Sequence, residues 1–165
     1  MNNWEIHQRE EDGVMITVLH HRVRGDVMTD CELEMDDMKP FLESNPSGNI
    51  AVGGLGLGLI IDKLLVMDGV ENIYVVEEQQ EVIDLTSPKY TSEDRVTIVK
   101  GDARTFDLSK IPYEIDVVYM DIWDNDLGDT FEDRLEVCKH WGNTCKDCFS
   151  WALDRSRENY KKSSI

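Results

Sequence analysis

Long apolar runs are missing from this chain of 165 residues. No segment reaches the roughly 18 uninterrupted apolar residues that a membrane-spanning helix needs, and the opening stretch MNNWEIHQREEDG is too polar for a secretory signal peptide. Internal repeats, low-complexity tracts and long linkers are missing too. We therefore expect one compact, cytoplasmic domain, in which residues 1–48 pack against a core formed by residues 49–165.

Basic residues are scarce, because 17 lysines and arginines face 34 aspartates and glutamates, for a formal net charge of −17. Proteins that bind DNA or RNA neutralise phosphates with lysine and arginine, so this balance argues against a nucleic-acid partner. An acidic cleft concentrates cations, which suits a small cationic substrate. The same charge also serves solubility alone, so it excludes partners better than it identifies one.

Cysteine is also rare, and a chain that buries a core of this size does not need a disulfide framework. The segment CKHWGNTCKDC nevertheless gathers four possible zinc ligands. Its CxxC half has the spacing of a zinc site, but the C-x-H half has a short spacing for two ligands of one metal. In addition, the alternation of apolar residues in CFSWA predicts that Cys148 is buried in the core. We expect reduced structural cysteines and no metal. The weaker alternative is a zinc site formed by Cys138, His140, Cys145 and Cys148.

Apolar patterning predicts a hairpin and a helix in the first 48 residues. Residues 4–24 read as two strands around the Asp12-Gly13 pair, which favours a tight turn. Thr29 and Glu32 have the spacing of a capping box, so a helix is expected to begin there. Pro40 is expected to kink or end that helix.

From residue 49 onward, short aliphatic segments alternate with helical ones. This alternation is typical of strand–helix–strand units with right-handed crossovers, and the aliphatic strands indicate a sheet covered on both faces. The expected fold is α/β, a Rossmann-like, mostly parallel sheet with the N-terminal hairpin and helix alongside. Strands are expected at 49–54, 72–77, 95–101, 114–123 and 148–152, and helices at 57–67, 79–86, 130–141 and the C-terminal end.

Four glycines stand within six positions of the stretch NIAVGGLGLGLIID, at 53, 54, 56 and 58. They occupy the first strand-to-helix turn, which is where open parallel sheets bind ligands, beyond the carboxyl ends of the strands. Glycine allows a sharp turn and the close approach of another group. The pattern is weak evidence by itself, because tight packing of strand on helix also explains it.

Acidic residues follow the next three expected strands. Glu77 ends the second and can accept both hydroxyls of a ribose, and Asp102 follows the third and can accept a hydrogen bond from an adenine amino group. Asp121 ends the fourth and faces the same crevice. Each acid alone could be a solvated residue or a helix cap, but their recurrence favours a nucleoside site. A dinucleotide fingerprint needs a glycine at position 59, which is Leu59, so a dehydrogenase is disfavoured.

These segments resemble the class I S-adenosylmethionine-dependent methyltransferase fold over about residues 49–125, with VGGLGLG, VVE, KGDA and YMDIW as its successive motifs. The resemblance implies a methyltransferase that binds S-adenosylmethionine. The chain departs from the family's pattern in that it has little room for the family's sixth and seventh strands. Asp121 would bind or deprotonate the acceptor, supported by Asp124 and Asn125, and Trp123 would cover the cofactor or stack on a planar substrate. The implied cofactor contacts are Gly54, Gly56, Gly58, Glu77, Asp102, Ala103, Asp121 and Trp123.

A narrower resemblance is to spermidine synthases, which transfer an aminopropyl group from decarboxylated S-adenosylmethionine on the same fold. VMTDCELEMDDM and MDIWDN would match their acidic helix and Asp-rich motif, so Asp30, Glu34 and Asp121 would line a cleft for a diammonium substrate. The chain is also similar to small methyltransferase-like proteins of phage-type genomes. A further alternative is a non-catalytic or regulatory protein that has the same fold and binds a nucleoside without turnover. The sequence indicates neither the acceptor nor the oligomeric state.

Overall fold

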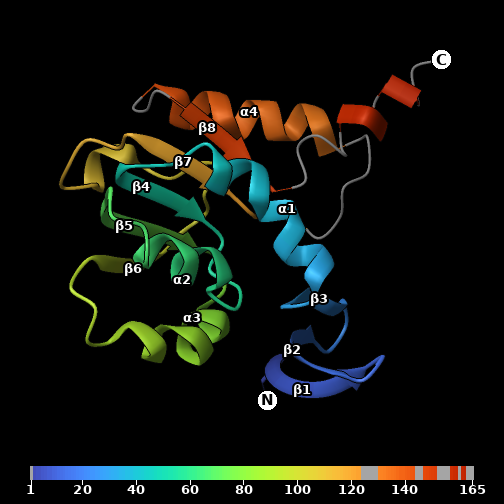
Figure 1. The fold of residues 1–165 in the computed structure, drawn as a ribbon. Coiled ribbons are helices and arrows are strands. Elements are labelled where there is room, and N and C mark those ends of the chain that lie inside the picture. Colours follow the sequence, from blue (N-terminus) through green and yellow to red (C-terminus); the bar gives the residue numbers. More distant parts are fainter. Residues whose placement is uncertain (1, 124–129, 144–146, 152–156, 160, 163–165) are drawn as a thin grey trace.

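A computed structural model describes residues 2–123, 130–143, 147–151, 157–159 and 161–162. It contains a small antiparallel sheet and a larger parallel sheet with helices around it (Figure 1). The elements, with η for a 3₁₀ helix, are β1 (Trp4–Glu11), β2 (Val14–His21), β3 (Gly25–Thr29), α1 (Glu32–Glu43), β4 (Gly48–Gly53), α2 (Leu59–Leu65), β5 (Val70–Glu77), α3 (Gln80–Thr86), η1 (Ser87–Tyr90), β6 (Val96–Lys100), η2 (Leu108–Lys110), β7 (Val117–Met120), α4 (Thr130–Gly142) and β8 (Asp147–Ser150).

The larger sheet has the strand order β6-β5-β4-β7-β8, and all its neighbouring strands are parallel. The predicted Rossmann-like α/β class is therefore confirmed. The chain first builds outward from β4 to β5 and β6, and then returns to place β7 on the other side of β4. This reversal between β4 and β7 is the switch point at which such sheets bind ligands.

Both faces of the parallel sheet are covered, as the aliphatic strands predict. In β4, Ile50, Ala51 and Val52 are all fully buried. Ile50 and Val52 pack with α1, α2 and α3, whereas Ala51 packs with α4 on the opposite face. Figure 1 shows α4 on one side of the sheet and α2 and α3 on the other. The alternation of side chains along one strand thus builds two cores.

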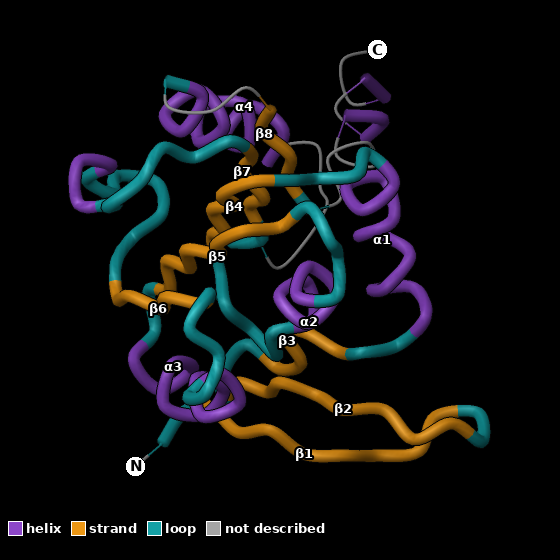
Figure 2. The backbone as a smooth tube through the Cα atoms, turned by 60° about the vertical axis from the view of Figure 1, so that its left-hand side comes forward, coloured by secondary structure: helices purple, strands orange, loops and turns teal. Residues whose placement is uncertain are grey.

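The N-terminal hairpin is confirmed, and its turn has positive φ at both Asp12 (49°) and Gly13 (81°), as a tight hairpin turn requires. A third strand, β3, pairs antiparallel with β2 and was not expected. Figure 2 shows β1 and β2 as a long ribbon whose turn extends away from the parallel sheet. The division into residues 1–48 and 49–165 stays a prediction.

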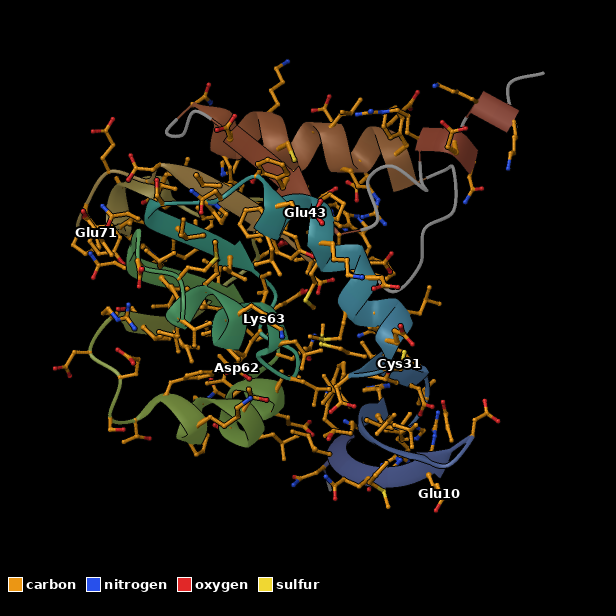
Figure 3. The ribbon with its side chains drawn as sticks, viewed as in Figure 1. Glu10, Cys31, Glu43, Asp62, Lys63 and Glu71 are labelled. Carbon is orange, nitrogen blue, oxygen red and sulfur yellow. The ribbon has the colours of Figure 1, made fainter. Side chains whose placement is uncertain are left out.

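Helix α1 begins later than expected, and of the two outcomes expected at Pro40, a kink or an end, the end is not observed. It begins after Cys31, which makes no side-chain cap, at the junction with β3 seen in Figure 3. The predicted Thr29–Glu32 capping box is wrong, because Glu34 instead accepts the backbone N–H of Thr29, at 3.2 Å. Pro40 lies inside the helix, which continues to Glu43.

The antiparallel sheet is attached to the core through its first strand. The backbone N–H groups of Asn3 and Trp4 donate to the Glu81 carboxylate on α3, at 2.6 and 3.2 Å. The Trp4 side chain is only 6% exposed. These contacts hold the antiparallel sheet over the carboxyl ends of the parallel strands. Among the described residues, none of the helices is long and apolar enough to cross a membrane.

Candidate functional site

A pocket lies at the carboxyl ends of β4, β5, β6 and β7, between them and the antiparallel sheet. Its empty volume is about 780 Å³, a figure that includes the space at its open mouth. The antiparallel sheet contributes Trp4, Leu19, Arg24, Val27 and Met28. The residues predicted from the sequence that line the pocket are Gly54, Gly56, Glu77, Asp102, Ala103, Asp121 and Trp123.

The loop between β4 and α2 has positive φ at Gly54 (89°), Gly56 (50°) and Gly58 (79°), where other residues are strained. A Cβ atom on each would collide with protein atoms rather than with open pocket. It would lie 2.1 Å from the Asp121 carbonyl oxygen at Gly54, 2.6 Å from Met28 Sδ at Gly56 and 2.1 Å from Tyr90 Oη at Gly58. The glycines therefore permit the protein's own close packing. Gly58 is outside the pocket lining among described residues and instead precedes α2.

Backbone N–H groups of this glycine loop are engaged within the protein. Phosphate-binding loops aim such donors at the ligand. Here three of the four N–H groups given below donate to oxygen atoms of the protein, which leaves too few donors for a pyrophosphate and suits a group that packs against the backbone. The hydrogen bonds are Gly54 N–H to Val76 O at 2.9 Å, Leu55 N–H to Glu77 Oε2 at 2.7 Å, Leu57 N–H to Met28 Sδ at 3.4 Å and Gly58 N–H to Leu55 O at 2.9 Å.

Three successive carbonyls of the glycine loop are held by α3 and η1. Thr86 Oγ1 donates to Gly56 O at 2.7 Å, Lys89 Nζ to Leu57 O at 2.9 Å and Tyr90 Oη to Gly58 O at 3.0 Å. The same Tyr90 hydroxyl, which has a single proton to share between the two acceptors, lies 2.7 Å from Asp62 Oδ1 on α2, the helix whose Asp62 and Lys63 are labelled in Figure 3. Burial, and then Asp62, raise the pKa of Tyr90 above its ordinary value. Sequence reasoning missed this support, because the partners lie about thirty residues from the loop.

Glu77 ends β5 and is only 8% exposed. One carboxylate oxygen accepts the N–H of Leu55 and the other the N–H of Gln79, at 2.7 and 2.8 Å. Burial raises the pKa of the Glu77 carboxyl, and this effect outweighs the backbone hydrogen bonds that lower it. The N–H of Gly56 also contributes, more weakly, and a carboxylate has about four lone pairs, so Glu77 can still accept hydroxyl donors at the pocket wall.

Asp102 and Ala103 follow β6. The Asp102 Oδ1 atom accepts the N–H of Arg104 at 2.9 Å, which forms a local turn and leaves the second carboxylate oxygen for other donors. Ala103 is buried, and its carbonyl accepts the indole N–H of Trp141 from α4 at 2.8 Å. A small side chain here lets α4 pack directly behind the pocket.

Trp123, just after β7, is fixed on several sides. Its indole N–H donates to Asp133 Oδ2 at 2.7 Å, and Arg104 donates to the same oxygen at 2.7 Å. The guanidinium of Arg134, a fully buried residue, lies 4.4 Å from the Trp123 ring centroid, and that of Arg104 lies 5.7 Å away. A ligand in the pocket therefore meets an aromatic wall with a defined orientation.

Comparison by sequence finds nothing, because neither a protein-family model nor a curated protein matches the chain. Solved structures do match. The spermidine synthase from Thermotoga maritima aligns over 99% of this chain and 63% of its own, with 18% identity and a TM-score of 0.57. The N-methyltransferase NodS from Bradyrhizobium japonicum WM9 aligns over 70% of this chain and 61% of its own, with 11% identity and a TM-score of 0.51.

The protein has the class I S-adenosylmethionine-dependent methyltransferase fold. The N-terminal domain of EvdMO1, determined in the presence of SAH and D-fucose, matches over 88% of this chain and 57% of its own, with 17% identity and a TM-score of 0.56. The chain thus spans about three fifths of the length of these structures. At such identities the likeness, including that to the spermidine synthase, concerns the fold alone.

On the methyltransferase fold, Asp121 follows β7 and its backbone N–H donates to Gly53 O at 2.7 Å. Nearby, the Tyr119 hydroxyl is buried, and within the described part of the chain it has no hydrogen-bond partner. Burial raises the pKa of Tyr119, and the charges of Asp121, Asp37 and Glu34 raise it further. These three carboxylates therefore act on one hydroxyl between α1 and β7. Asp37, three residues after Glu34 on the same helix face, was missed by sequence reasoning.

The remaining predicted residues have other places. Asp30 accepts the N–H of Thr17 at 2.7 Å, so it ties β2 to the start of α1, and it does not line the pocket among the described residues. Asp124 and Asn125 lie outside the residues that the structure describes. Their expected part in catalysis stays a prediction.

The cysteine segment is engaged within the fold. The Cys148 thiol hydrogen-bonds to Cys138 and lowers the pKa of Cys138. The His140 ring nitrogen Nε2 lies 2.9 Å from the carbonyl oxygen of Phe106. Cys145 lies outside the described residues, and those described hold no group of three or more potential metal ligands. The zinc alternative thus receives no support from the described part.

Proposed function

We propose that the protein is a methyltransferase that uses S-adenosylmethionine and acts on a small acceptor. The observation that carries the proposal is the convergence of the glycine loop, Glu77, Asp102 and Asp121 in one pocket at the switch point of this fold. In it, Glu77 accepts the ribose hydroxyls and Asp102 the adenine amino group. The glycine loop packs against the methionine part of the cofactor.

The chemistry of the pocket fits this cofactor. Buried and half-buried carboxylates suit a nucleoside with hydroxyl and amino donors and a positive sulfonium. The engaged N–H groups of the glycine loop disfavour a nucleotide that binds through phosphates. When bound, the cofactor supplies an activated methyl group. The chain itself positions the acceptor, and Asp121 binds it or accepts its proton.

Calorimetry tests the proposal directly. We expect the protein to bind S-adenosylmethionine and S-adenosylhomocysteine, but not ATP or NAD. Glu77→Gln should weaken binding of S-adenosylhomocysteine about tenfold or more, because a buried acceptor of ribose hydroxyls is replaced. Glu71→Gln is the matched control, since Glu71 is exposed at the opposite end of β5. A folded protein that binds neither form of the cofactor would overturn the proposal.

Asp121→Asn tests the assigned role of Asp121. Turnover should fall about 10²-fold to 10⁴-fold while cofactor binding is retained, as expected for a group that handles the acceptor's proton. Unchanged turnover together with unchanged acceptor binding would remove that role.

A second candidate, aminopropyl transfer from decarboxylated S-adenosylmethionine, is favoured by one observation. The charges of Glu34, Asp37 and Asp121 all raise the pKa of the buried Tyr119 hydroxyl, and Asp121 lines the pocket, where a carboxylate suits an ammonium group of the acceptor. This candidate requires decarboxylated S-adenosylmethionine to bind more tightly than its parent, and Asp37→Asn to weaken amine binding. Tighter binding of the parent, with methylation of an amine, would select the methyltransferase instead.

A further inference from the structure

The side chain of Met28 reaches from β3 onto the glycine loop. Met28 pairs in register with Leu19 of β2, and both residues line the pocket. Its Sδ atom lies 3.4 Å from the backbone nitrogen of Leu57. A Cβ on Gly56 would lie 2.6 Å from Sδ and 2.8 Å from Cε, so the thioether rests on the bare backbone of Gly56.

The Leu57 N–H has a weaker partner than the N–H groups of Gly54, Leu55 and Gly58. Those three donate to carbonyl or carboxylate oxygens at 2.7–2.9 Å. A thioether sulfur is a poor acceptor. The N–H of Leu57 therefore gains most when a stronger acceptor takes the place of the sulfur of Met28, which lines the pocket, and a carboxylate is the strongest of the common acceptors.

The movable partner in this contact is Met28. The loop backbone is fixed, because Lys89 holds the carbonyl of Leu57 and Thr86 holds that of Gly56, at 2.9 and 2.7 Å. Methionine has three rotatable bonds and adapts its shape at low cost. The thioether, and not the loop, is therefore the part of this contact that can move aside at low cost.

We propose that Met28 is a displaceable cover of the glycine loop that gives way to the carboxylate of an amino-acid-bearing nucleoside. This inference rests on the proposed cofactor. Met28 caps the Leu57 N–H in the free protein, and the ligand carboxylate replaces Sδ as the acceptor. A nucleoside without the carboxylate enters the pocket and leaves Met28 where it is. Met28 therefore distinguishes S-adenosylmethionine and S-adenosylhomocysteine from decarboxylated or shortened nucleosides.

Methionine methyl NMR of the intact protein tests the inference. The chain has seven methionines, and Met28→Leu assigns the resonance of interest. We expect S-adenosylhomocysteine to shift the Met28 methyl resonance, and 5′-methylthioadenosine, which lacks the amino-acid part, to leave it in place. Met15 is the internal control, since it is 60% exposed on the hairpin. Its resonance should shift with neither ligand.

Affinity gives a second readout. Leucine has nearly the volume of methionine but offers no acceptor, so Met28→Leu leaves the Leu57 N–H without its partner in the free protein. We expect this variant to bind S-adenosylhomocysteine about twofold to fivefold more tightly, with unchanged affinity for 5′-methylthioadenosine. Met15→Leu should change neither affinity.

The possible outcomes separate this inference from the proposed function. If S-adenosylhomocysteine binds without shifting the Met28 resonance, or if both ligands shift it equally, the cover does not respond to the carboxylate and the inference is overturned. If neither ligand binds to the folded protein, the proposed cofactor itself is wrong, and the inference is overturned with it.

Discussion

The Glu77 carboxylate accepts a hydrogen bond from the backbone N–H of Leu55 at 2.7 Å, and thereby joins the end of β5 to the glycine loop. Its other oxygen accepts the N–H of Gln79, just before α3. One buried side chain therefore shapes two sides of the pocket. Because burial raises its pKa, the ionised form is disfavoured unless further donors, such as ribose hydroxyls, reach it.

Glu77→Gln should destabilise the protein by about 1–3 kcal/mol, because glutamine has one acceptor oxygen for two backbone donors and leaves one of them unsatisfied. The loss should depend on pH. The raised pKa of Glu77 means that the folded state holds this proton more tightly than the unfolded state, so stability falls as pH rises from the ordinary value of 4.5 through the folded pKa. Glu77→Gln has no carboxyl group at this position, so it lacks this pH-dependent contribution to the free energy of unfolding.

Urea unfolding at pH 5 and pH 7 checks this. The difference in free energy of unfolding between wild type and Glu77→Gln should be larger at pH 5 than at pH 7. Glu71→Gln, at the exposed end of the same strand, should show no such change. If the difference between wild type and Glu77→Gln instead grows as pH rises, the pKa of Glu77 is not raised in the folded protein.

Gly58→Ala should destabilise the protein more than Gly13→Ala does. Both glycines have nearly the same positive φ, 79° and 81°, so the backbone cost of alanine, about 1–2 kcal/mol, is shared. At Gly13 the added methyl meets nothing within 4 Å, whereas at Gly58 it lies 2.1 Å from Tyr90 Oη. We expect an additional loss of about 2 kcal/mol at Gly58 from this clash and from the displaced Tyr90 hydrogen bonds.

Thermal unfolding of both alanine variants measures the difference. Adding Tyr90→Phe to Gly58→Ala should recover part of the additional loss, because the clashing oxygen is removed. Equal destabilisation at the two glycines would show that the packing of Tyr90 on the glycine loop has little energetic effect.

The sequence predicted those parts of the fold and the site that depend on local pattern. Aliphatic runs identify the parallel strands, and parallel strands bring their carboxyl ends together, so Glu77, Asp102 and Asp121 could be assigned to one pocket before the structure was known. The strand β3 escaped prediction because its five residues become a strand only by pairing with β2. That pairing is what carries Met28 to the glycine loop.

The partners of the glycine loop could not be predicted for a similar reason. Thr86, Lys89 and Tyr90 reach the loop across about thirty residues, and nothing in their local sequence indicates the contact. The glycine pattern by itself predicts the close approach of another group, either a ligand or a packed part of the protein. In the structure, the space at Gly54 and Gly58 is taken by Asp121 and Tyr90. A pattern of small residues predicts a close approach but not which group approaches.

Asp102→Asn should change which nucleoside base is preferred. Asp102 uses one carboxylate oxygen for the Arg104 turn, and the proposed function assigns the adenine amino group to this side chain. Loss of the charged acceptor should weaken binding of S-adenosylhomocysteine about tenfold to hundredfold. Binding of S-inosylhomocysteine, whose base carries an oxygen in place of the amino group, should weaken much less, because the asparagine amide can donate to that oxygen.

Competition calorimetry gives the ratio of the affinities for S-adenosylhomocysteine and S-inosylhomocysteine. Asp107→Asn is the matched control, because Asp107 forms a similar turn through Ser109 N–H at 3.0 Å but does not line the pocket among the described residues. An unchanged ratio for Asp102→Asn would assign Asp102 a purely structural part.

Asp133→Asn should weaken nucleoside binding without contacting the nucleoside. Asp133 Oδ2 accepts from both Trp123 and Arg104, each at 2.7 Å, and so fixes the aromatic wall of the pocket. A neutral amide holds two such donors less firmly, so the ring must be ordered when the ligand binds. Ordering one side chain costs about 0.5–1.5 kcal/mol, which corresponds to roughly a twofold to thirteenfold loss in affinity for S-adenosylhomocysteine.

Fluorescence separates this positioning role from a general loss of stability. Trp123 lines the pocket, so ligand binding should change tryptophan emission in the wild type, and Trp123→Phe should remove much of that change. In Asp133→Asn the change should persist at saturation but require more ligand. Glu136→Gln, exposed on the same helix, should match the wild type. Equal affinities for Asp133→Asn and Glu136→Gln would mean that Trp123 is held well enough by Arg134, whose guanidinium lies 4.4 Å from its ring centroid.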